Sequence, residues 1–403
     1  MKMWLDCLLW LPIVLWPLLE MARQFAAWRA LRAMPSPPAN DDDARFTGVD
    51  ALQPIRSGDP TLAEALGASL RALGARGAML HWLIDSDDTA AARIVRSVVD
   101  AQPTLRAQVA ISAHPPCPQG INPKLFKLDR ALAQCTGDTV LVLDDDARLP
   151  AATLDALLAA LTGSRGDAPV ISTALPIYLG TDRSLQGLGA RLLARFVNDS
   201  AAITYLPPRL GGRAPTINGM AWAMRRDALD AIDGFAPRLR HLTDDLAMAQ
   251  AVLAAGGRID QRREPVWMRT ALPDLRAYTR QMHRWMLFAR LLLRSQPWPI
   301  RLRIAVGQGL SALLPAIALT AFAMAPSWPA AVVIAIGATA HLYGRRALQR
   351  ACAGSSARIE PATSLLVALL LPLHILHALF DTRIRWREHH YRVFANDRFE
   401  EIP

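Results

Sequence analysis

Long apolar runs lie near both ends of the chain, whereas its middle alternates short apolar runs with polar segments. Residues 3–19 form the first long run, and three more follow at 304–325, 328–343 and 362–380. A helix needs about 20 apolar residues to cross the hydrocarbon of a bilayer, so only 304–325 is comfortably long enough. This pattern predicts membrane segments on both sides of a soluble domain.

The charges beside these runs predict an orientation. Arg23, Arg29 and Arg32 follow the first run, and the positive-inside rule then places the next residues in the cytoplasm. A cleaved signal peptide is the alternative, but its positive charge would precede the apolar run. If all four runs cross the membrane, the Arg-rich tail emerges opposite the domain. We therefore expect 328–343 or the Pro372-containing run to be re-entrant or interfacial.

The middle of the chain has the pattern of an α/β fold. Short apolar runs predict strands, and Ala/Leu-rich stretches between them predict helices. The strands are expected at 78–84, 107–112, 139–143 and 169–173, and the helices near 61–74, 89–100, 128–135 and 151–161. Such alternation is typical of a mostly parallel sheet, in which ligands bind beyond the carboxyl ends of the strands.

These patterns divide the chain into five expected regions. They are a membrane anchor at 1–32, a Pro-rich and acidic linker at 33–45, the α/β domain at 46–298, membrane segments at 299–380 and a basic cytoplasmic tail at 381–403.

Composition narrows the possible partners. The formal net charge is +10, but only three of the 45 basic residues are lysine, and the arginines cluster beside apolar runs. A membrane surface explains that placement better than nucleic acid, for which no recognition motif is present. The four cysteines have no zinc-ligand spacing, so we expect reduced thiols without a catalytic role.

Three acidic clusters follow predicted strands or begin a helix. They contain Asp85, Asp87 and Asp88; Asp144, Asp145 and Asp146; and Asp244 and Asp245. Any one aspartate is well explained as a helix cap or turn residue. Three adjacent carboxylates repel one another, however, and an Asp-x-Asp at a strand end suits a divalent cation that also binds phosphates. At a helix start, Asp245 is placed to act as a base.

A helical segment further along carries Gln281, Arg284 and Trp285. The spacing i, i+3 and i+4 puts these side chains on one helix face. An amphipathic helix with a docked tryptophan is the alternative. Residues 188–199 have the pattern of a second amphipathic helix, either interfacial or an ordinary surface helix. His374 and His377, three apart in the last apolar run, are expected to face other helices rather than a metal.

The order of these motifs resembles the membrane-bound family 2 type glycosyltransferases. It most closely resembles the ceramide glucosyltransferase-like family 21, of which bacterial hopanoid-associated glycosyltransferases are close relatives. The resemblance covers residues 51–394. It rests on QPIRSGDPTLAEAL, IDSDDTAAARIV, GINPKLFKL, LDDDARLPAATL, NGMAWAMRRDALDAIDGF, HLTDDLAMAQAVLAAGG, QMHRW and IRWREHHYR, in that order.

The resemblance implies a GT-A domain, which is a Rossmann-like α/β fold with a mixed, mostly parallel sheet, here with N- and C-terminal transmembrane helices. It implies Mg²⁺ or Mn²⁺, a UDP-sugar donor and inversion at the anomeric carbon. The implied metal ligands are Asp144 and Asp146, and the implied catalytic residues are Asp245 as base, Asp244, Gln281, Arg284 and Trp285. The implied nucleotide-binding residues are Asp85, Asp88, Asn122, Lys124 and Asp144.

The predicted function is the transfer of a sugar to the hydroxyl of a membrane lipid such as a ceramide or hopanoid. The predicted location is the bacterial inner membrane, with the domain facing the cytoplasm and no obligatory protein partner. A processive polysaccharide synthase and a non-catalytic membrane scaffold are the alternatives. The sequence departs from the family at Asp244, where Glu is usual, and at Thr89, where Pro is common. The first departure leaves the choice of base between Asp244 and Asp245 open.

Overall fold

The structure, a computed structural model, describes residues 2–35, 46–162, 168–179, 187–208, 214–269, 271–354, 360–386 and 389–402. Most of the expected linker, residues 36–45, lies outside the described residues. The chain forms two compact units. The first, here called the helical unit, comprises Met1–Met34, Gly180–Leu210 and Leu272–Glu388, and the second, the sheet unit, comprises Pro35–Leu179, Gly211–Ala271 and His389–Pro403.

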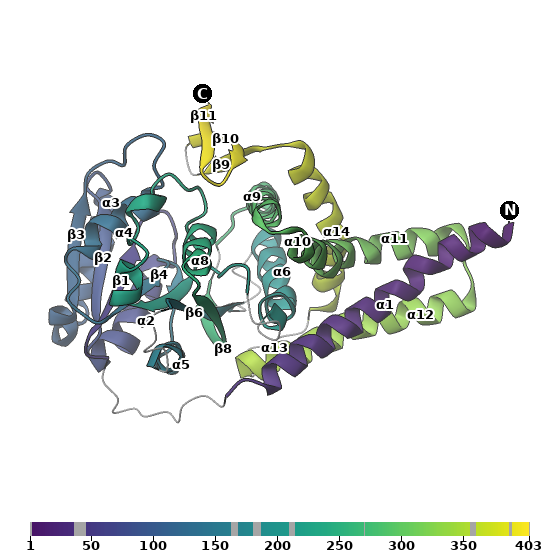
Figure 1. Cartoon of the computed structure of the whole chain (residues 1–403), viewed down its shortest axis with the longest axis horizontal. Helices are drawn as coiled ribbons and strands as arrows, with labels where there is room; N and C mark the ends of the chain where they lie inside the picture. Colours follow the sequence, from purple (N-terminus) through teal and green to yellow (C-terminus); the bar gives the residue numbers. More distant parts are fainter. Residues whose placement is uncertain are drawn as a thin grey trace. The chain divides into compact units, whose positions relative to one another are not determined.

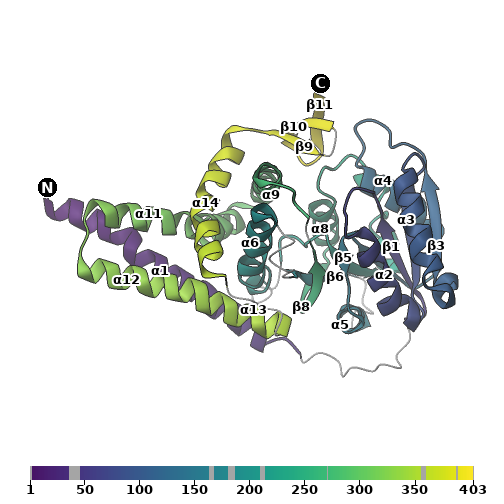
Figure 2. The same cartoon turned by 180° about the vertical axis from the view of Figure 1, so that it is seen from behind.

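The sheet unit is built on an eight-stranded sheet with the strand order β3-β2-β1-β4-β7-β6-β8-β5 (Figures 1 and 2). Its strands are β1 (Val49–Pro54), β2 (Met79–Asp85), β3 (Val109–His114), β4 (Thr139–Leu143), β5 (Ala147–Arg148), β6 (Val170–Tyr178), β7 (Ala221–Arg225) and β8 (Arg258–Met268).

Strand pairing makes this sheet mixed and mostly parallel. β1 pairs in parallel with β2 and β4, β2 with β3, and β6 with β8. β7 is antiparallel to both β4 and β6. The TVLVL segment of β4 suits this position because strands covered on both faces favour continuous apolar runs. The predicted α/β class with a mostly parallel sheet is confirmed.

Helices cover the sheet on both sides. In the sheet unit they are α2 (Leu62–Leu73), α3 (Thr89–Asp100), α4 (Pro123–Leu132), α5 (Ala151–Thr162), α7 (Arg226–Asp230) and α8 (Asp244–Ala254). One core cluster joins α4 and α8 to the sheet, with Leu128, Met248 and Val252 packed around the buried Trp222 of β7 and Phe235. This packing fixes the N-termini of α4 and α8 beside the carboxyl ends of β1, β2 and β4.

Two predicted elements have different bounds. The helix expected near 128–135 begins earlier, at Pro123, because Asn122 caps it and proline is well suited to the first helical turn. The strand expected at 169–173 continues to Tyr178 through a shift in its pairing with β8 between Thr173 and Leu175. A local irregularity of this kind lets a strand continue past a break in the hydrophobic pattern.

The helical unit contains the apolar runs. Its elements are α1 (Lys2–Arg32), α6 (Leu188–Tyr205), α9 (Leu275–Ser295), α10 (Trp298–Ile304), α11 (Ser311–Met324), α12 (Trp328–Thr339), α13 (Arg345–Ala353), α14 (Pro361–Phe380) and the short strand β9 (Arg383–Trp386). Short π-helical segments join α10 to α11 at Ala305–Leu310 and α12 to α13 at Ala340–Gly344. The predicted helix at 188–199 is present as α6, but Ala190, Leu193 and Val197 are buried, so it lies inside the unit.

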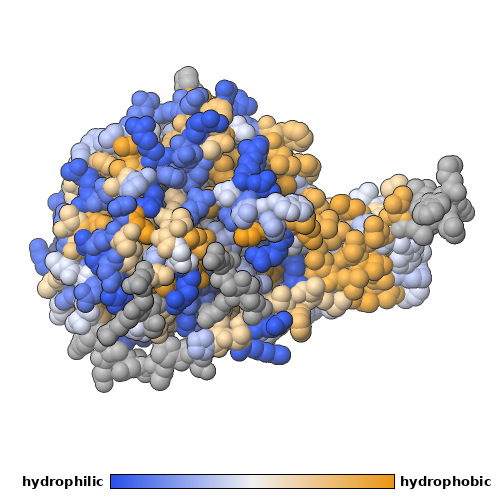
Figure 3. Space-filling view, in the orientation of Figure 1, coloured by the Kyte–Doolittle hydropathy of each residue, from blue (hydrophilic) through white to orange (hydrophobic). Residues whose placement is uncertain are grey.

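Helices α1, α11 and α12 pack together and still expose apolar side chains. Ile13 and Trp16 of α1 join Leu314, Ala318 and Ala330 in one buried cluster. Figure 3 shows that the surface over these three helices is hydrophobic. Two helical stretches among the described residues are long and apolar enough to cross a membrane, Trp298–Met324 and Pro361–Phe380.

A buried polar contact joins α1 to α13. Glu20 of α1 accepts hydrogen bonds from both Nε and Nη2 of Arg345 in α13, and its side chain is 2% exposed. Gln24 donates to Glu20 and to the backbone oxygen of Ala340. A buried carboxylate needs such partners, because an unpaired charge is costly in an apolar environment.

Candidate active site

Acidic residues gather at the carboxyl ends of the strands in the sheet unit. Asp85 is the last residue of β2, and Asp144 directly follows β4. Asp145 and Asp146 continue the turn that leads to β5. Asp244 and Asp245 form the first turn of α8. Because a parallel sheet presents its ligand-binding side at these ends, the three acidic clusters predicted from sequence lie on that side of the sheet.

Lys124 connects two of these clusters. Its Nζ atom lies 2.7 Å from Oδ1 of Asp144 and 2.8 Å from Oδ2 of Asp244, and it donates to the backbone oxygen of Gly219 at 3.2 Å. Burial alone would lower the pKa of this amine, but the two carboxylates outweigh burial and raise it. Lys124 is therefore a fixed positive charge between β4 and α8.

Asn122 holds Lys124 in place. As the N-cap of α4, its Oδ1 accepts hydrogen bonds from the backbone N–H groups of Lys124 and Leu125. Its amide nitrogen donates to the backbone oxygens of His241 and Leu242, just before α8. The side chain is 1% exposed, so its bonding capacity is used within the protein. Asn122 thus aligns α4 with the loop that carries the α8 carboxylates.

Asp85 and Asp88 are also engaged within the sheet unit. Asp85 pairs with Nζ of Lys127 at 3.1 Å and lies 3.8 Å from a guanidinium nitrogen of Arg56. Asp88 caps α3 and accepts hydrogen bonds from the backbone N–H groups of Ala91 and Ser57. Burial opposes ionisation of Asp88, but these hydrogen bonds prevail and lower its pKa. Sequence reasoning missed the buried lysine partner of Asp85.

The Asp144–Asp146 turn holds excess negative charge. Burial and then repulsion from Asp145, Asp144 and Asp59 raise the pKa of Asp146 well above its ordinary value. Asp144 is paired with Lys124, whereas Asp146 forms no ion pair with any residue in the described part of the chain. A carboxylate that neighbouring carboxylates repel is suited to a hard divalent cation, which would remove the repulsion.

Asp245 differs from its neighbour Asp244. Asp244 is paired with Lys124, whereas Oδ1 of Asp245 accepts a hydrogen bond from the backbone N–H of Leu246. Burial and the adjacent Asp244 charge raise the pKa of Asp245 to about 7. A carboxyl group that titrates near neutrality can both take and release a proton at physiological pH.

The C-terminal hairpin fixes the loop before α8. It consists of β10 (His389–Ala395) and β11 (Arg398–Ile402), paired antiparallel, with Asn396 in its turn. Oδ1 of Asn396 accepts hydrogen bonds from the backbone N–H and the hydroxyl of Thr243, both at 2.8 Å. The backbone oxygen of Asn396 accepts from the N–H of Leu242. No sequence pattern indicated this role, because Asn396 and Thr243 are far apart along the chain.

Gln281, Arg284 and Trp285 lie in the helical unit, on α9. Nη2 of Arg284 donates to Oε1 of Gln281 at 2.9 Å, which agrees with the predicted shared helix face. The Trp285 ring lies 6.0 Å from the Phe196 ring of α6, measured between centroids. The structure therefore places these three residues with the apolar helices, and the carboxylates with the sheet.

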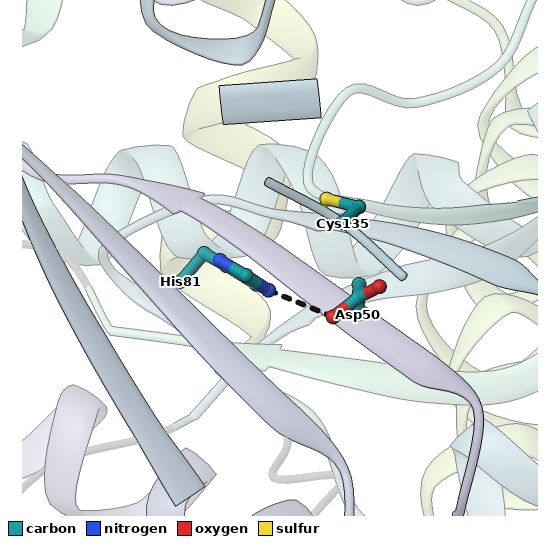
Figure 4. A group of neighbouring side chains, drawn as sticks. All are labelled: Asp50, His81 and Cys135. Carbon is teal, nitrogen blue, oxygen red and sulfur yellow. Dashed lines mark hydrogen bonds and ion pairs between the residues drawn. The ribbon is translucent and has the colours of Figure 1, made fainter. Parts of the chain in front are cut away.

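A cluster of Asp50, His81 and Cys135 lies toward the amino ends of β1 and β2, as shown in Figure 4. Asp50 of β1 is 2.7 Å from Nε2 of His81 in β2, and Cys135 is close by. Asp50 also accepts hydrogen bonds from the backbone N–H groups of Thr136 and Gly137. Burial opposes ionisation of Asp50, but these partners lower its pKa, while burial raises the pKa of the Cys135 thiol to about 12. The protonated thiol and the engaged carboxylate make this a structural cluster.

Comparison with known proteins places the chain in a family. The model of glycosyl transferase family 21 matches residues 13–399. The chain belongs to family 21. This match confirms the family predicted from the order of the sequence motifs, and the family 21 chain is therefore a glycosyltransferase.

One solved structure supports the fold of this family 21 protein. It is similar to the mannosyltransferase PcManGT from Pyrobaculum calidifontis in complex with GDP-Man and Mn²⁺, with a TM-score of 0.52 and 19% identity over 90% of this chain and 99% of that one. Glucosyl-3-phosphoglycerate synthase from Mycobacterium tuberculosis in complex with Mn²⁺, UDP and phosphoglyceric acid matches with a TM-score of 0.30 and 18% identity, over 53% of this chain and 67% of that one. No curated protein matches. The likeness to PcManGT agrees with a GT-A fold.

Proposed function

We propose that this family 21 protein transfers a sugar from a UDP-sugar to the hydroxyl of a membrane lipid, with inversion at the anomeric carbon. One observation carries the proposal. At the carboxyl ends of the strands, Lys124 joins Asp144 to Asp244, while Asp146 and Asp245 beside them keep raised pKa values. Such an arrangement offers both a cation site for a diphosphate and a carboxylate for an acceptor proton.

Asp245 is the better of the two candidates for the base. The Lys124 ammonium pairs with Asp244, so this carboxylate is already engaged within the site. Asp245 has no ion pair among the described residues, and its pKa is raised to about 7. In the proposed reaction, Asp245 accepts the proton of the attacking hydroxyl as the new glycosidic bond forms and the bond from the sugar to the diphosphate breaks.

Asp144 and Asp146 are the proposed metal ligands. The fit rests on the charge that the turn leaves uncompensated at Asp146. Mg²⁺ or Mn²⁺ would neutralise negative charge on the diphosphate leaving group. PcManGT, which shares the fold, is described in complex with GDP-Man and Mn²⁺. This supports the metal-dependent use of a nucleotide-sugar donor by the family 21 protein. Lys124 and Arg284 are proposed as further positive groups for the diphosphate, and Gln281 and Trp285 for the acceptor side.

Asp85, Asp88 and Asn122 are proposed to shape the nucleotide site. Asp85 is placed at the end of β2 by Lys127, and Asp88 orders the backbone at Ser57 and the start of α3. Asn122 orients Lys124. These contacts position the site, and Asp85 remains the proposed direct nucleotide contact.

A lipid acceptor is proposed from the apolar helices. Trp298–Met324 and Pro361–Phe380 are long enough to cross a bilayer, and the Gln281–Trp285 motif belongs to the same unit as both. The three arginines that follow the apolar part of α1 favour a cytoplasmic catalytic domain at 46–298 in the bacterial inner membrane, with anchors at 1–32 and 299–380. The linker at 33–45 and the tail at 381–403 complete this proposed organisation.

The test is incubation of membranes containing the full chain with a panel of UDP-sugars, followed by mass spectrometry of the lipids. We expect one lipid class to gain a single hexose or N-acetylhexosamine when Mn²⁺ or Mg²⁺ is present. A long sugar polymer would instead indicate a processive synthase. UDP binding that ignores both Mn²⁺ and the change Asp146→Asn would contradict the metal assignment.

A further inference from the structure

The helical unit contains a cationic pocket at the end of a candidate membrane-spanning helix. Its volume is about 470 Å³, and four arginines contribute to its lining: Arg276 and Arg280 from α9, and Arg383 and Arg385 from β9. Thr279, His283 and His377 complete the polar lining. All of these residues belong to the helical unit.

The positive charge of this pocket exceeds the negative charge near it. Asp381 pairs with Arg383 at 3.1 Å, and Asp274 uses its Oδ1 to cap α9. Arg276 and Arg280 are exposed, and neither forms an ion pair with a residue in the described ranges. An anion that entered the pocket would therefore meet guanidinium groups that no carboxylate has neutralised.

An apolar stripe leads along α14 to this pocket. Leu373, Leu376, His377 and Phe380 follow the spacing i, i+3, i+4 and i+7, which places them on one helix face. Leu373 is 60% exposed, Leu376 46% and Phe380 87%. The same helix is long and apolar enough to cross a membrane, so the pocket lies where the span ends. Apolar surface that continues into a cationic pocket is complementary to a lipid with an anionic headgroup.

The pocket and the Gln281–Trp285 motif occupy different faces of α9. Arg276, Arg280 and His283 recur at i, i+4 and i+7, whereas Gln281 and Trp285 lie roughly half a turn away at 100° per residue. The contact between Trp285 and Phe196 confirms that the motif faces α6. A lipid in the pocket would thus occupy a site separate from the residues proposed to handle the acceptor.

We infer that this pocket binds the phosphate headgroup of an anionic phospholipid, with its acyl chain along the exposed face of α14. The bound lipid is not a reactant. It joins α9, which carries the Gln281–Trp285 motif, to α14 and β9 at the membrane surface. The hydrogen-bond contact between Nε2 of His283 and the backbone oxygen of Arg383, at 2.9 Å, already connects α9 to β9 and shapes the pocket floor.

A metal ion is the main competing occupant. His283, His377 and Asp381 offer ligand atoms within 4.8 Å of one another. Asp381, however, is paired with the Arg383 side chain. Four arginines around the site would also repel a divalent cation. Charge therefore favours an anion.

The experiment measures lipid retention by the purified full chain with native mass spectrometry. The chain is incubated with phosphatidylglycerol or phosphatidylcholine carrying the same acyl chains. We expect preferential retention of phosphatidylglycerol, and a loss of about 30-fold in its affinity in the double variant Arg276→Gln/Arg280→Gln, roughly fivefold for each arginine near an anionic surface. Arg93→Gln/Arg96→Gln, an exposed pair on α3 that removes the same charge, should retain the lipid as the wild type does.

Additional measurements identify what occupies the pocket. Phe380→Ser should weaken binding of long-chain phosphatidylglycerol but leave a short-chain form unaffected. Equal retention by the wild type and the Arg276/Arg280 variant would overturn the inference. So would displacement of the lipid by inorganic phosphate at comparable concentration, which would indicate a site for a free anion. Stoichiometric Zn²⁺ binding that is lost in His377→Ala would overturn it in favour of a metal site. Because the readout is binding, these outcomes do not depend on transferase activity.

Discussion

At the amino ends of β1 and β2, Asp50 contacts His81 and two backbone N–H groups, whereas beyond the carboxyl end of β4, Asp146 is repelled by three other carboxylates. The first group keeps its charge in a buried position because every partner favours the ionised form. Asp146 ionises less readily, because burial and the neighbouring carboxylates raise its pKa. One sheet thus separates a carboxylate engaged within the fold from carboxylates that we propose bind a ligand. The sign of the pKa shift distinguishes Asp50 from Asp146.

The largest expected effect is at the carboxyl end. Asp245→Asn removes the proposed proton acceptor while preserving the size of the side chain. We expect sugar transfer to fall by about 10²- to 10⁴-fold, the usual contribution of general-base catalysis, with UDP-sugar binding largely retained. Initial rates and isothermal titration on the full chain measure the two quantities. Transfer that persists within about tenfold of the wild type would remove Asp245 from this role.

Asp50→Ala tests the contribution of Asp50, at the amino ends of β1 and β2, to the stability of the fold. It leaves His81 and the N–H groups of Thr136 and Gly137 without their buried partner. Leaving a buried donor without its acceptor costs about 1–3 kcal/mol, so we expect the variant to unfold at a lower urea concentration. Tryptophan fluorescence in detergent follows the transition, and Asp100→Ala, at an exposed position, is the control.

The same variant sharpens the contrast in two further ways. Mn²⁺ affinity of the folded Asp50→Ala protein should equal that of the wild type, and a large loss would mean that the two ends of the sheet are not independent.

Because the folded-state pKa of Asp50 is lowered, the stabilisation by Asp50 is present above its unfolded pKa of about 3.9 and is lost as the pH falls through the folded-state pKa. The stability difference between the wild type and the variant should therefore narrow in acid.

The pH dependence of transfer provides a smaller effect at the carboxyl end. Burial and Asp244 raise the pKa of Asp245 to about 7, and a base acts in its deprotonated form. We expect kcat/KM to rise about tenfold per pH unit below that value and to level off above it. Rates at subsaturating UDP-sugar give the profile. A flat profile across this range would mean that Asp245 does not titrate in the free enzyme.

The smallest expected effect is at the C-terminal hairpin. Asn396→Ala removes the acceptor for the N–H and hydroxyl of Thr243, which precede the α8 carboxylates. Losing this hydrogen-bond acceptor should weaken the positioning of the α8 carboxylates by about 1 kcal/mol. We therefore expect kcat to fall roughly fivefold, with little change in UDP-sugar affinity. Asp397→Ala, at an exposed position in the same turn, should retain full kcat. An equal loss in both variants would point to general disturbance of the hairpin.

Much of the fold follows from local hydrophobic pattern, but not all of it. The TVLVL run predicts β4 to the residue, since a buried strand leaves a continuous apolar signal. β8 gave no such signal, because its sequence RIDQRREPVWM contains several charged residues. In the structure, Arg262 lies near both Asp260 and Glu264, so these charges partly neutralise one another within the strand. A pattern of hydrophobicity cannot reveal partners of this kind.

The site was predictable in its residue types and less so in its contacts. The acidic clusters at Asp85, Asp144–Asp146 and Asp244–Asp245 were identified because each follows a strand or begins a helix. Sequence could not distinguish Asp244 from Asp245, which depends on where Lys124 points. It also gave no indication of Asn396, whose contact with Thr243 joins residues 153 positions apart. Contacts across such distances arise only when the sheet and helices have packed.

The buried contact between Glu20 and Arg345 has a consequence for how the protein is made. These residues are 325 positions apart, so α1 leaves the ribosome long before its partner is synthesised. If α1 anchors the protein in the membrane as proposed, Glu20 has to remain hydrated or protonated during that interval, since an isolated charge enters lipid poorly. Stable insertion of the first helix would then be completed late, when α13 arrives. A nascent chain truncated before Arg345 is expected to leave its first helix weakly anchored and exposed to membrane quality control.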